Sequence, residues 1–326
     1  MTARTVAKRL AWHLLGRPSR LARRIEGLRA AGQMPILNLH RVSDDRSSSY
    51  GAIAPDLFAG LVDWMQERFT LVTFRDLADG RTWAKPPAIL SFDDGYRDFL
   101  ETVDPILSAR GVAANLNIVP RVVDSGRPPL NVQIQDFIGQ APRSLLAETP
   151  LPGTDAAFRT RSDRGTLGLR ASAVLKSMPF AEQERAFAAL VPFMDSLGGF
   201  RTTPVLDLAS LRVVAERHEI GAHSHDHATM TVETAAYLAD DLDRCRRWFA
   251  DHLAFAPQVY AFPNGAAHPA QIDAVAGAGY RHVLLVGERT SAPGNRVHGR
   301  ITMHGNAPRE LAARALGGRQ SFGQGT

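Results

Sequence analysis

The chain has 326 residues, of which 44% are hydrophobic and 22% are charged, a composition that excludes a disordered or fibrous protein. This length accommodates one large α/β domain or two smaller ones. The single cysteine, Cys245, cannot form an internal disulfide, so the fold does not depend on an oxidising compartment. No apolar run approaches the roughly 20 residues of a membrane-spanning helix.

The first thirty residues carry much of the excess positive charge, which is +5 for the whole chain. Their only acid is Glu26, and their basic residues are Arg4, Lys8, Arg9, Arg17, Arg20, Arg23, Arg24 and Arg29. Because the charge is concentrated in one segment, we expect no nucleic-acid partner. Apolar residues recur between the arginines, which predicts one or two amphipathic helices over residues 1–32, broken near Gly16-Arg17-Pro18.

Two interpretations of this basic segment stay open. It either associates peripherally with an anionic membrane surface or packs on the main domain with its basic face in water. A secretory signal is not expected, because the apolar stretch 10–15 is short and is interrupted by His13. We therefore expect a cytoplasmic protein, which under the first interpretation would associate with the inner membrane surface.

The main domain is predicted to span residues 33–317, and its first part alternates strands with helices. Strands are predicted at 35–40, 71–74, 88–94 and 113–119, with helices beginning at residue 55 and covering 75–79 and 96–110. This alternation indicates a parallel α/β arrangement, in which active-site residues collect at the C-terminal ends of strands. His40 and the pair Asp93-Asp94 lie at such ends. Adjacent buried carboxylates are costly to desolvate, and a bound cation is a common compensation.

Residues 120–210 interrupt this alternation. Proline, glycine, arginine and threonine are frequent there, and helical patterns are scattered, as at 181–194. We interpret the segment as a largely helical insertion that covers the site.

The alternation then resumes and continues to the end of the domain. Helices are predicted at 208–217, 232–250, 269–277 and 307–316, and strands at 219–222, 259–262, 282–286 and 297–303. A flexible tail is expected over 318–326. Polar or turn residues again follow strands, at the histidine cluster 223–227 and at Pro263-Asn264-Gly265.

The histidine cluster offers metal ligands. His223 and His227 are four residues apart, so a helical turn beginning just after the strand would place both on one face, with His225 facing away. Two histidines with Asp94 as the carboxylate leave positions open on a zinc ion, as catalytic sites require. Asp93 would then stay off the metal as a base.

At this point the chain resembles the NodB-homology polysaccharide deacetylases, carbohydrate esterase family four. Ser91-Phe92-Asp93-Asp94-Gly95 resembles their first motif, and His223-Ser224-His225-Asp226-His227 resembles their second. Phe262-Pro263-Asn264-Gly265 is similar to the groove motif in its Tyr-Pro-x-Gly variant. Leu37-Asn38-Leu39-His40-Arg41-Val42 resembles the lead-in of a bacterial subgroup linked to exopolysaccharide or lipid-linked glycan assembly. The similarity runs in order over 35–317, except for the insertion.

The resemblance implies a distorted (β/α)7 barrel with a divalent metal, usually zinc. It implies that Asp93 is the general base and that Asp94, His223 and His227 are the metal ligands. The implied reaction is hydrolysis of an N-acetyl group from an amino sugar, with metal-bound water as the nucleophile. An N-acetylated saccharide is therefore the expected substrate.

The chain departs from the family pattern at two functions. The leaving amine needs a general acid, for which His304 is the candidate, with His298 and His40 as alternatives. Ala261 replaces the arginine that braces the base, and Arg300 from the last strand is expected to supply that charge.

A recognisable Asp-to-Trp motif is missing as well. We expect Pro263, Asn264, Gly265, Arg300 and His40 to line the substrate site. Two other functions stay open: an O-deacetylase or non-sugar amidase on the same barrel, and a glycan-binding protein that has lost catalysis.

Overall fold

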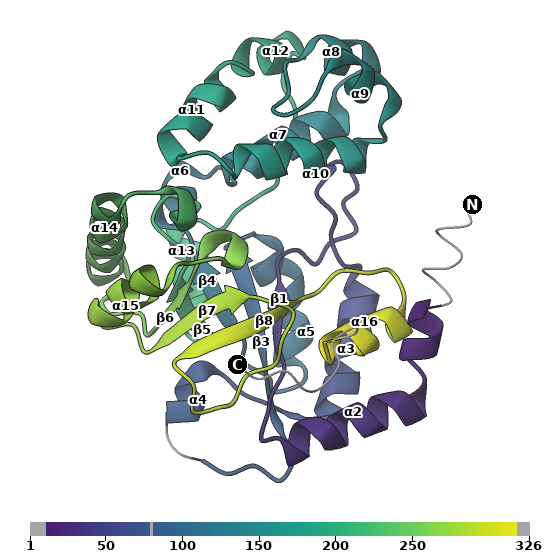
Figure 1. Ribbon diagram of the computed structural model, residues 1–326, viewed down its shortest axis with the longest axis vertical. Helices are drawn as coiled ribbons and strands as arrows, with labels where there is room; N and C mark the ends of the chain where they lie inside the picture. Colours follow the sequence, from purple (N-terminus) through teal and green to yellow (C-terminus); the bar gives the residue numbers. More distant parts are fainter. Residues whose placement is uncertain (1–10, 79–80, 318–326) are drawn as a thin grey trace.

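The structure is a computed structural model that describes residues 11–78 and 81–317 (Figure 1). Its described strands are β1 (Ile36–Leu39), β2 (Thr70–Leu71), β3 (Pro87–Asp94), β4 (Asn115–Ile118), β5 (Glu219–Ala222), β6 (Val259–Ala261), β7 (His282–Val286) and β8 (Val297–Thr302). All of their pairings are parallel. The order β1-β8-β7-β6-β5-β4-β3 closes because β3 also pairs with β1, and β2 adds only to the start of β3. The predicted seven-stranded barrel is confirmed, and its distortion lies between β5 and β6, which share a single register pair, Ala222 with Tyr260.

The strand alternation divides the barrel interior into two levels. On β3, Ile89 lies in an apolar cluster with residues such as Phe74 and Leu284. Further along the same face, Ser91 meets Asn115 of β4 and Asp93 meets Arg300 of β8 across the barrel interior. The apolar lower level closes the barrel, and the polar upper level faces the C-terminal ends of the strands.

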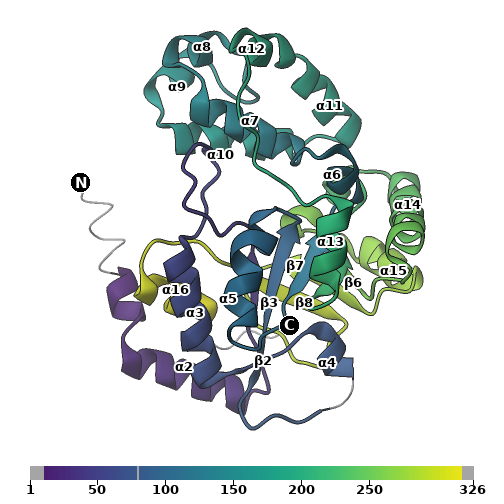
Figure 2. The same ribbon diagram turned by 180° about the vertical axis from the view of Figure 1, so that it is seen from behind.

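Helices cover the outside of the barrel (Figure 2). They are α3 (Pro55–Arg68), α5 (Asp104–Ser108), α13 (Leu208–Ala215), α14 (Ala235–Leu253), α15 (Pro269–Gly277) and α16 (Pro308–Ala315). The short helix α4 (Phe74–Ala78) instead lies at the N-terminal ends of the strands, where Phe74 joins the apolar interior cluster. Short turns η1 (Phe99–Val103), η2 (Met230–Val232) and η3 (Pro263–Gly265) complete the connections. The outward side chains of the strands pack with these helices in the main hydrophobic core, as Leu90 and Phe92 do on β3.

The insertion forms a helical layer over the C-terminal ends of the strands (Figures 1 and 2). Its helices are α6 (Pro120–Ser125), α7 (Leu130–Gln140), α8 (Arg143–Glu148), α9 (Ala156–Arg161), α10 (Arg164–Leu175), α11 (Phe180–Ala188) and α12 (Val191–Ser196). Its buried side chains, including Ile134, Phe137 and Leu167, form a second hydrophobic cluster separate from the barrel core. The loop after β1 reaches this layer, where the N–H and hydroxyl of Ser49 both donate to the Gln135 carbonyl, at 3.1 and 2.8 Å.

The N-terminal segment packs on the barrel. Residues 11–15 are helical, the chain breaks at Gly16-Arg17, and α2 (Pro18–Ala30) follows. Leu21 and Leu28 of α2 belong to the main hydrophobic core, while Arg20 and Arg23 are exposed. This is the packing that the second interpretation predicts, and it gives no support to membrane association. No helix in the described part of the chain combines the length and apolarity needed to cross a bilayer.

Several predicted elements differ from the structure. The strand predicted at 71–74 is only two residues long, because Phe74 already begins α4. The helix predicted at 96–110 is shorter and contains the π-turn η1 before α5. The helix predicted at 181–194 is two helices, α11 and α12, and the insertion is far more continuously helical than its composition indicated. The tail predicted over 318–326 lies outside the described residues.

Candidate metal centre

Asp93 lies on the interior face of β3 in a buried ion pair with the last strand. Its Oδ1 accepts hydrogen bonds from Arg300 Nη1 and Asn117 Nδ2, each at 2.8 Å. The expected pairing of Arg300 with Asp93 is therefore present, and both side chains are almost fully buried. Burial alone would raise the pKa of Asp93, but the positive charge and the hydrogen bond of Arg300 outweigh it and the pKa is about 2. The carboxylate is ionised at neutral pH, and Oδ2 carries neither of these hydrogen bonds.

Asp94 leaves the strand geometry at the end of β3. Its φ is +77° and that of Gly95 is +76°, and a left-handed conformation in a residue with a side chain is strained in a way typical of functional sites. Oδ2 accepts a hydrogen bond from the Tyr96 hydroxyl at 2.8 Å. Oδ1 is buried without a well-formed hydrogen bond and lies 3.3 Å from His227 Nε2 and 3.5 Å from His223 Nε2. A cation between these three atoms would satisfy the unpaired lone pairs of Asp94 Oδ1 and of the two imidazole nitrogens.

The loop that carries the two histidines is not helical. The predicted helical turn from His223 to His227 is wrong, because the residues between them form bends and both Ser224 and His227 have φ of +63°. Asp241 of α14 holds this loop by accepting from Ser224 Oγ and His225 N, each at 2.8 Å. Side-chain hydrogen bonds therefore bring the two imidazoles together where the sequence pattern predicted a helix.

His223 presents an unprotonated nitrogen to the site. Its Nδ1 lies 2.8 Å from the Ala261 carbonyl and donates to it, because a carbonyl oxygen only accepts. Burial lowers the pKa of His223 to about 4 even though Asp93 and Asp94 oppose the shift. The neutral imidazole thus directs the lone pair of Nε2 toward Asp94. His225 faces away, as predicted, with Nδ1 2.9 Å from Asp226 Oδ1.

A divalent cation fits this arrangement. One ligand atom each from Asp94, His223 and His227 lies within 4.8 Å of the others. Ligands at about 2.0–2.2 Å in tetrahedral geometry lie about 3.3 Å apart. The observed separations of 3.3 and 3.5 Å match that value before any adjustment of the side chains. Asp93 contributes to the same cavity without belonging to this ligand set.

The predicted groove residues form the turn η3 next to the histidine loop. Asn264 has φ of +60°, and its Nδ2 donates to Thr229 Oγ1 at 2.6 Å. Gly265 has φ of +68°, and a Cβ at this position would lie 2.3 Å from the Val286 side chain. Pro263 and Gly265 are buried, whereas Asn264 is exposed and turns toward the loop that carries His227.

The three candidate acids lie in different environments. His304 is exposed and follows β8. His298 is buried in the barrel interior, 3.1 Å from His282, where burial lowers its pKa to about 3. His40 is partly buried at the end of β1, against the ring of Tyr50. Burial lowers the pKa of His40, and the negative charges of the two aspartates at the end of β3 oppose that shift, which places this imidazole in their field.

The sequence analysis missed residues that contact the two aspartates. Tyr96 orients Asp94, and Asn117 holds Asp93. The alternation of asparagine and apolar residues over 115–118 was the available signal, because a buried strand with asparagine at every second position must satisfy those amides inside the barrel. Lys176, at the end of α10, is a further partly buried cation. Burial lowers its pKa, and the negative charge of Asp94 opposes that shift.

Comparisons with known proteins bear on the fold and on the segment that carries the histidine loop. Residues 207–283, which include the histidine loop, match the family model of polysaccharide deacetylase. The chain shares its fold with the Streptococcus pyogenes deacetylase PplD, solved in complex with acetate, at a TM-score of 0.58 and 14% identity over 87% of this chain and 98% of that one. IcaB from Ammonifex degensii gives a TM-score of 0.54 at 15% identity, over 87% and 97% of the two chains. A de-N-acetylase from Aggregatibacter actinomycetemcomitans gives 0.52 at 16% identity, over 82% and 94%. No curated protein sequence matches the chain.

Proposed function

We propose that this chain is a metal-dependent hydrolase that removes N-acetyl groups from an amino sugar of a polysaccharide or lipid-linked glycan. The observation that carries the proposal is the buried Asp94 Oδ1, which faces two imidazole nitrogens beside the ionised carboxylate of Asp93. The shared fold supports the substrate class, since the similar proteins include a deacetylase and a de-N-acetylase. Because the motif over residues 37–42 resembles a subgroup linked to exopolysaccharide or lipid-linked glycan assembly, we propose a glycan of that kind as the substrate.

Zinc is the ion that we propose for the centre. Two imidazoles and one carboxylate are a donor set of catalytic zinc sites that leaves a coordination position open. When bound, such an ion supplies a lowered pKa for water and Lewis-acid polarisation of the substrate carbonyl. Asp94, His223 and His227 would hold it, with Tyr96 fixing the orientation of Asp94.

Asp93 is the general base in this proposal. Its Oδ1 is fixed by Arg300 and Asn117, so Oδ2 is the atom that receives a proton from the attacking water. Because the ion pair keeps Asp93 ionised over a wide pH range, the acceptor is ready before substrate binds. The reaction forms a bond from the water oxygen to the acetyl carbon and breaks the amide C–N bond, which yields acetate and a free amino sugar.

The leaving nitrogen requires a proton as the C–N bond breaks. His304 is the candidate from the sequence, and His40 is the alternative that lies in the field of both aspartates. The backbone N–H of Asn264, on the strained turn after β6, is the proposed donor to the oxyanion.

Acetate release from matched N-acetylated and O-acetylated oligosaccharides tests this function. We expect release from the N-acetylated series, and loss of that release in Asp93→Asn with the metal content retained. Release from the O-acetylated series alone would assign the barrel to ester hydrolysis. Saccharide binding without acetate release from either series would identify a binding protein instead.

A further inference from the structure

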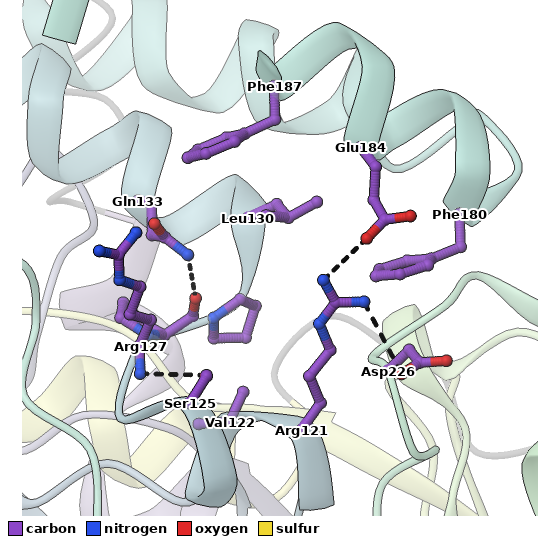
Figure 3. Close-up of a pocket in the computed structure, with 12 residues that line it drawn as sticks. Arg121, Val122, Ser125, Arg127, Leu130, Gln133, Phe180, Glu184, Phe187 and Asp226 are labelled. Atoms are coloured by element: carbon purple, nitrogen blue, oxygen red, sulfur yellow. Dashed lines mark hydrogen bonds and ion pairs between the residues drawn. The ribbon is translucent and has the colours of Figure 1, made fainter. Parts of the chain in front are cut away.

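A separate pocket of about 260 Å³ lies between the barrel and the insertion (Figure 3). Helix α6 forms its floor, α7 and α11 form its upper wall, and the histidine loop closes one side. The lining side chains that bear on its chemistry are Arg121, Arg127, Leu130, Phe180, Glu184 and Phe187. None of them takes part in the proposed reaction.

The pocket combines aromatic and aliphatic surface with hydrogen-bonding groups. Phe187 and Leu130 face the cavity from the insertion (Figure 3). The Arg121 guanidinium lies over the ring of Phe180, 5.0 Å from its centroid. A ligand held here needs an apolar face for stacking and polar groups at its edge, which is the character of a pyranose ring.

Both acidic and basic side chains line the pocket. Arg121 pairs with Glu184 at 2.7 Å and lies 3.9 Å from Asp226. Arg127 lines the opposite side and forms no ion pair with a described residue. Two guanidinium groups and two carboxylates together offer both donors and acceptors, which suits hydroxyl groups. Asp226 is also paired with Arg244 at 2.7 Å, so both carboxylates are already compensated and the free hydrogen-bonding capacity of the pocket is what a ligand meets.

The pocket shares a wall with the metal centre. The backbone N–H of Arg121 donates to the His225 carbonyl at 3.0 Å. Asp226 lines the pocket and immediately precedes the metal-ligand candidate His227. The loop therefore presents one side to the cation site and the other to this pocket. A chain that extends from the metal centre past the loop would reach the pocket.

We propose that this pocket is a distal sugar subsite, which binds an N-acetylhexosamine unit of the glycan other than the unit being hydrolysed. The size supports one ring, since pockets for larger ligands measure about 300–1,000 Å³. The inference rests on the proposed function for its substrate class. It implies that the insertion makes the enzyme specific for chains over free monosaccharides.

Oligosaccharide length dependence tests the subsite. Phe187→Ala removes a stacking face, and Glu184→Gln replaces a carboxylate with an uncharged amide that also donates. The matched controls are Phe193→Ala, which also trims a ring packed on the insertion core, and Glu182→Gln on the same helix. N-acetylglucosamine oligomers from the monosaccharide to the hexasaccharide serve as probes. Acetate release gives kcat/KM where turnover occurs, and calorimetric titration gives Kd where it does not.

We expect each pocket variant to lose about 10-fold in kcat/KM or affinity for the hexasaccharide, and nothing for the monosaccharide, while both controls match the wild type. Equal losses at every length, or pocket variants that behave like the controls, overturn the subsite. Stronger binding of a carboxylated oligosaccharide than of the N-acetylglucosamine oligomer of the same length overturns the assignment of the subsite to N-acetylhexosamine.

The subsite and the proposed function can fail separately. Hexasaccharide turnover that the pocket variants leave unchanged refutes the subsite and keeps the function. Hexasaccharide binding that those variants weaken, without acetate release, refutes the function and keeps the subsite. A hexasaccharide that is neither bound nor hydrolysed refutes both.

Discussion

Replacing Arg300 with methionine should separate the role of the ion pair from that of the metal ligands. Methionine fills part of the same buried space, so the principal change is the loss of the charge opposite Asp93. At 2.8 Å and an effective dielectric constant of about 20, the attraction is about 6 kcal/mol before desolvation is counted. Removing one partner of such a buried pair costs about 3–5 kcal/mol, because the other charge is left without compensation.

The same loss should appear in the pKa of Asp93. A change of about 3 kcal/mol corresponds to about two pKa units, which would move the pKa of Asp93 from about 2 to about 4 or above. The wild-type pKa lies below its ordinary value of 3.8, so the ion pair stabilises the fold above that pH and this stabilisation is lost as pH falls toward 2. In Arg300→Met the stabilisation is absent at neutral pH, and Asp93 takes up its proton at a higher pH.

We expect Arg300→Met to lower kcat/KM for acetate release by about 10²-fold, to move the acidic limb of its pH profile upward, and to retain bound metal. Denaturant unfolding should show the loss of stability in parallel. Arg314→Met is the control, because Arg314 forms a 2.9 Å ion pair with Glu310 on α16. An unshifted acidic limb in Arg300→Met would refute the proposed bracing of Asp93, and loss of the metal would show that Arg300 supports the metal ligands instead.

Other variants test the remaining assignments. Tyr96→Phe removes the 2.8 Å hydrogen bond that orients Asp94, so metal affinity should fall about 10- to 100-fold, and an unchanged metal Kd would contradict this role. His304→Ala should lower turnover with the metal content intact, and full activity in that variant would transfer the role of acid to His40. Burial raises the pKa of Glu219 to about 7 from an ordinary value of 4.5, so wild-type stability should fall by up to about 3 kcal/mol as pH rises through that interval. Glu219→Gln should flatten this dependence in urea titrations, and an unaltered slope would show that another group is responsible.

The residues at strand ends were predictable because strand and helix patterns are local. Asp93 and Asp94 follow an apolar run, and parallel topology brings the ends of distant strands together. Arg300 was predictable by the same reasoning, since it occupies a strand expected to lie in the same barrel. Arg300 pairs at 2.8 Å with Asp93, the carboxylate for which the motif at Ala261 supplies no arginine.

The geometry of the histidine loop was not predictable from spacing. The pattern from His223 to His227 fits one helical face, yet the loop is set by left-handed residues and by Asp241, which comes from a helix that begins later in the chain. A short polar segment has no periodicity that distinguishes a helical turn from a tethered loop. The prediction therefore named both histidines, His223 and His227, but assumed a helical turn that does not form.

The largely helical insertion was predicted, but its packing was not, because its core is internal to it. Leu167 and Phe137 pack against one another's helices, but glycine and proline break the periodicity between the short helices. The pocket beside Arg121 depends on how α11 approaches α6, which is a tertiary contact between segments more than fifty residues apart. No local pattern in the sequence indicates it.

Metal reconstitution coupled to acetate release tests the proposed reaction most directly. After chelation, the wild-type chain should lose acetate release from an N-acetylated oligosaccharide and regain it with one equivalent of zinc, while Asp94→Ala should neither bind that equivalent nor regain activity. Undiminished acetate release from the fully chelated protein, or stoichiometric zinc binding by Asp94→Ala, would contradict a metal centre built on Asp94, His223 and His227.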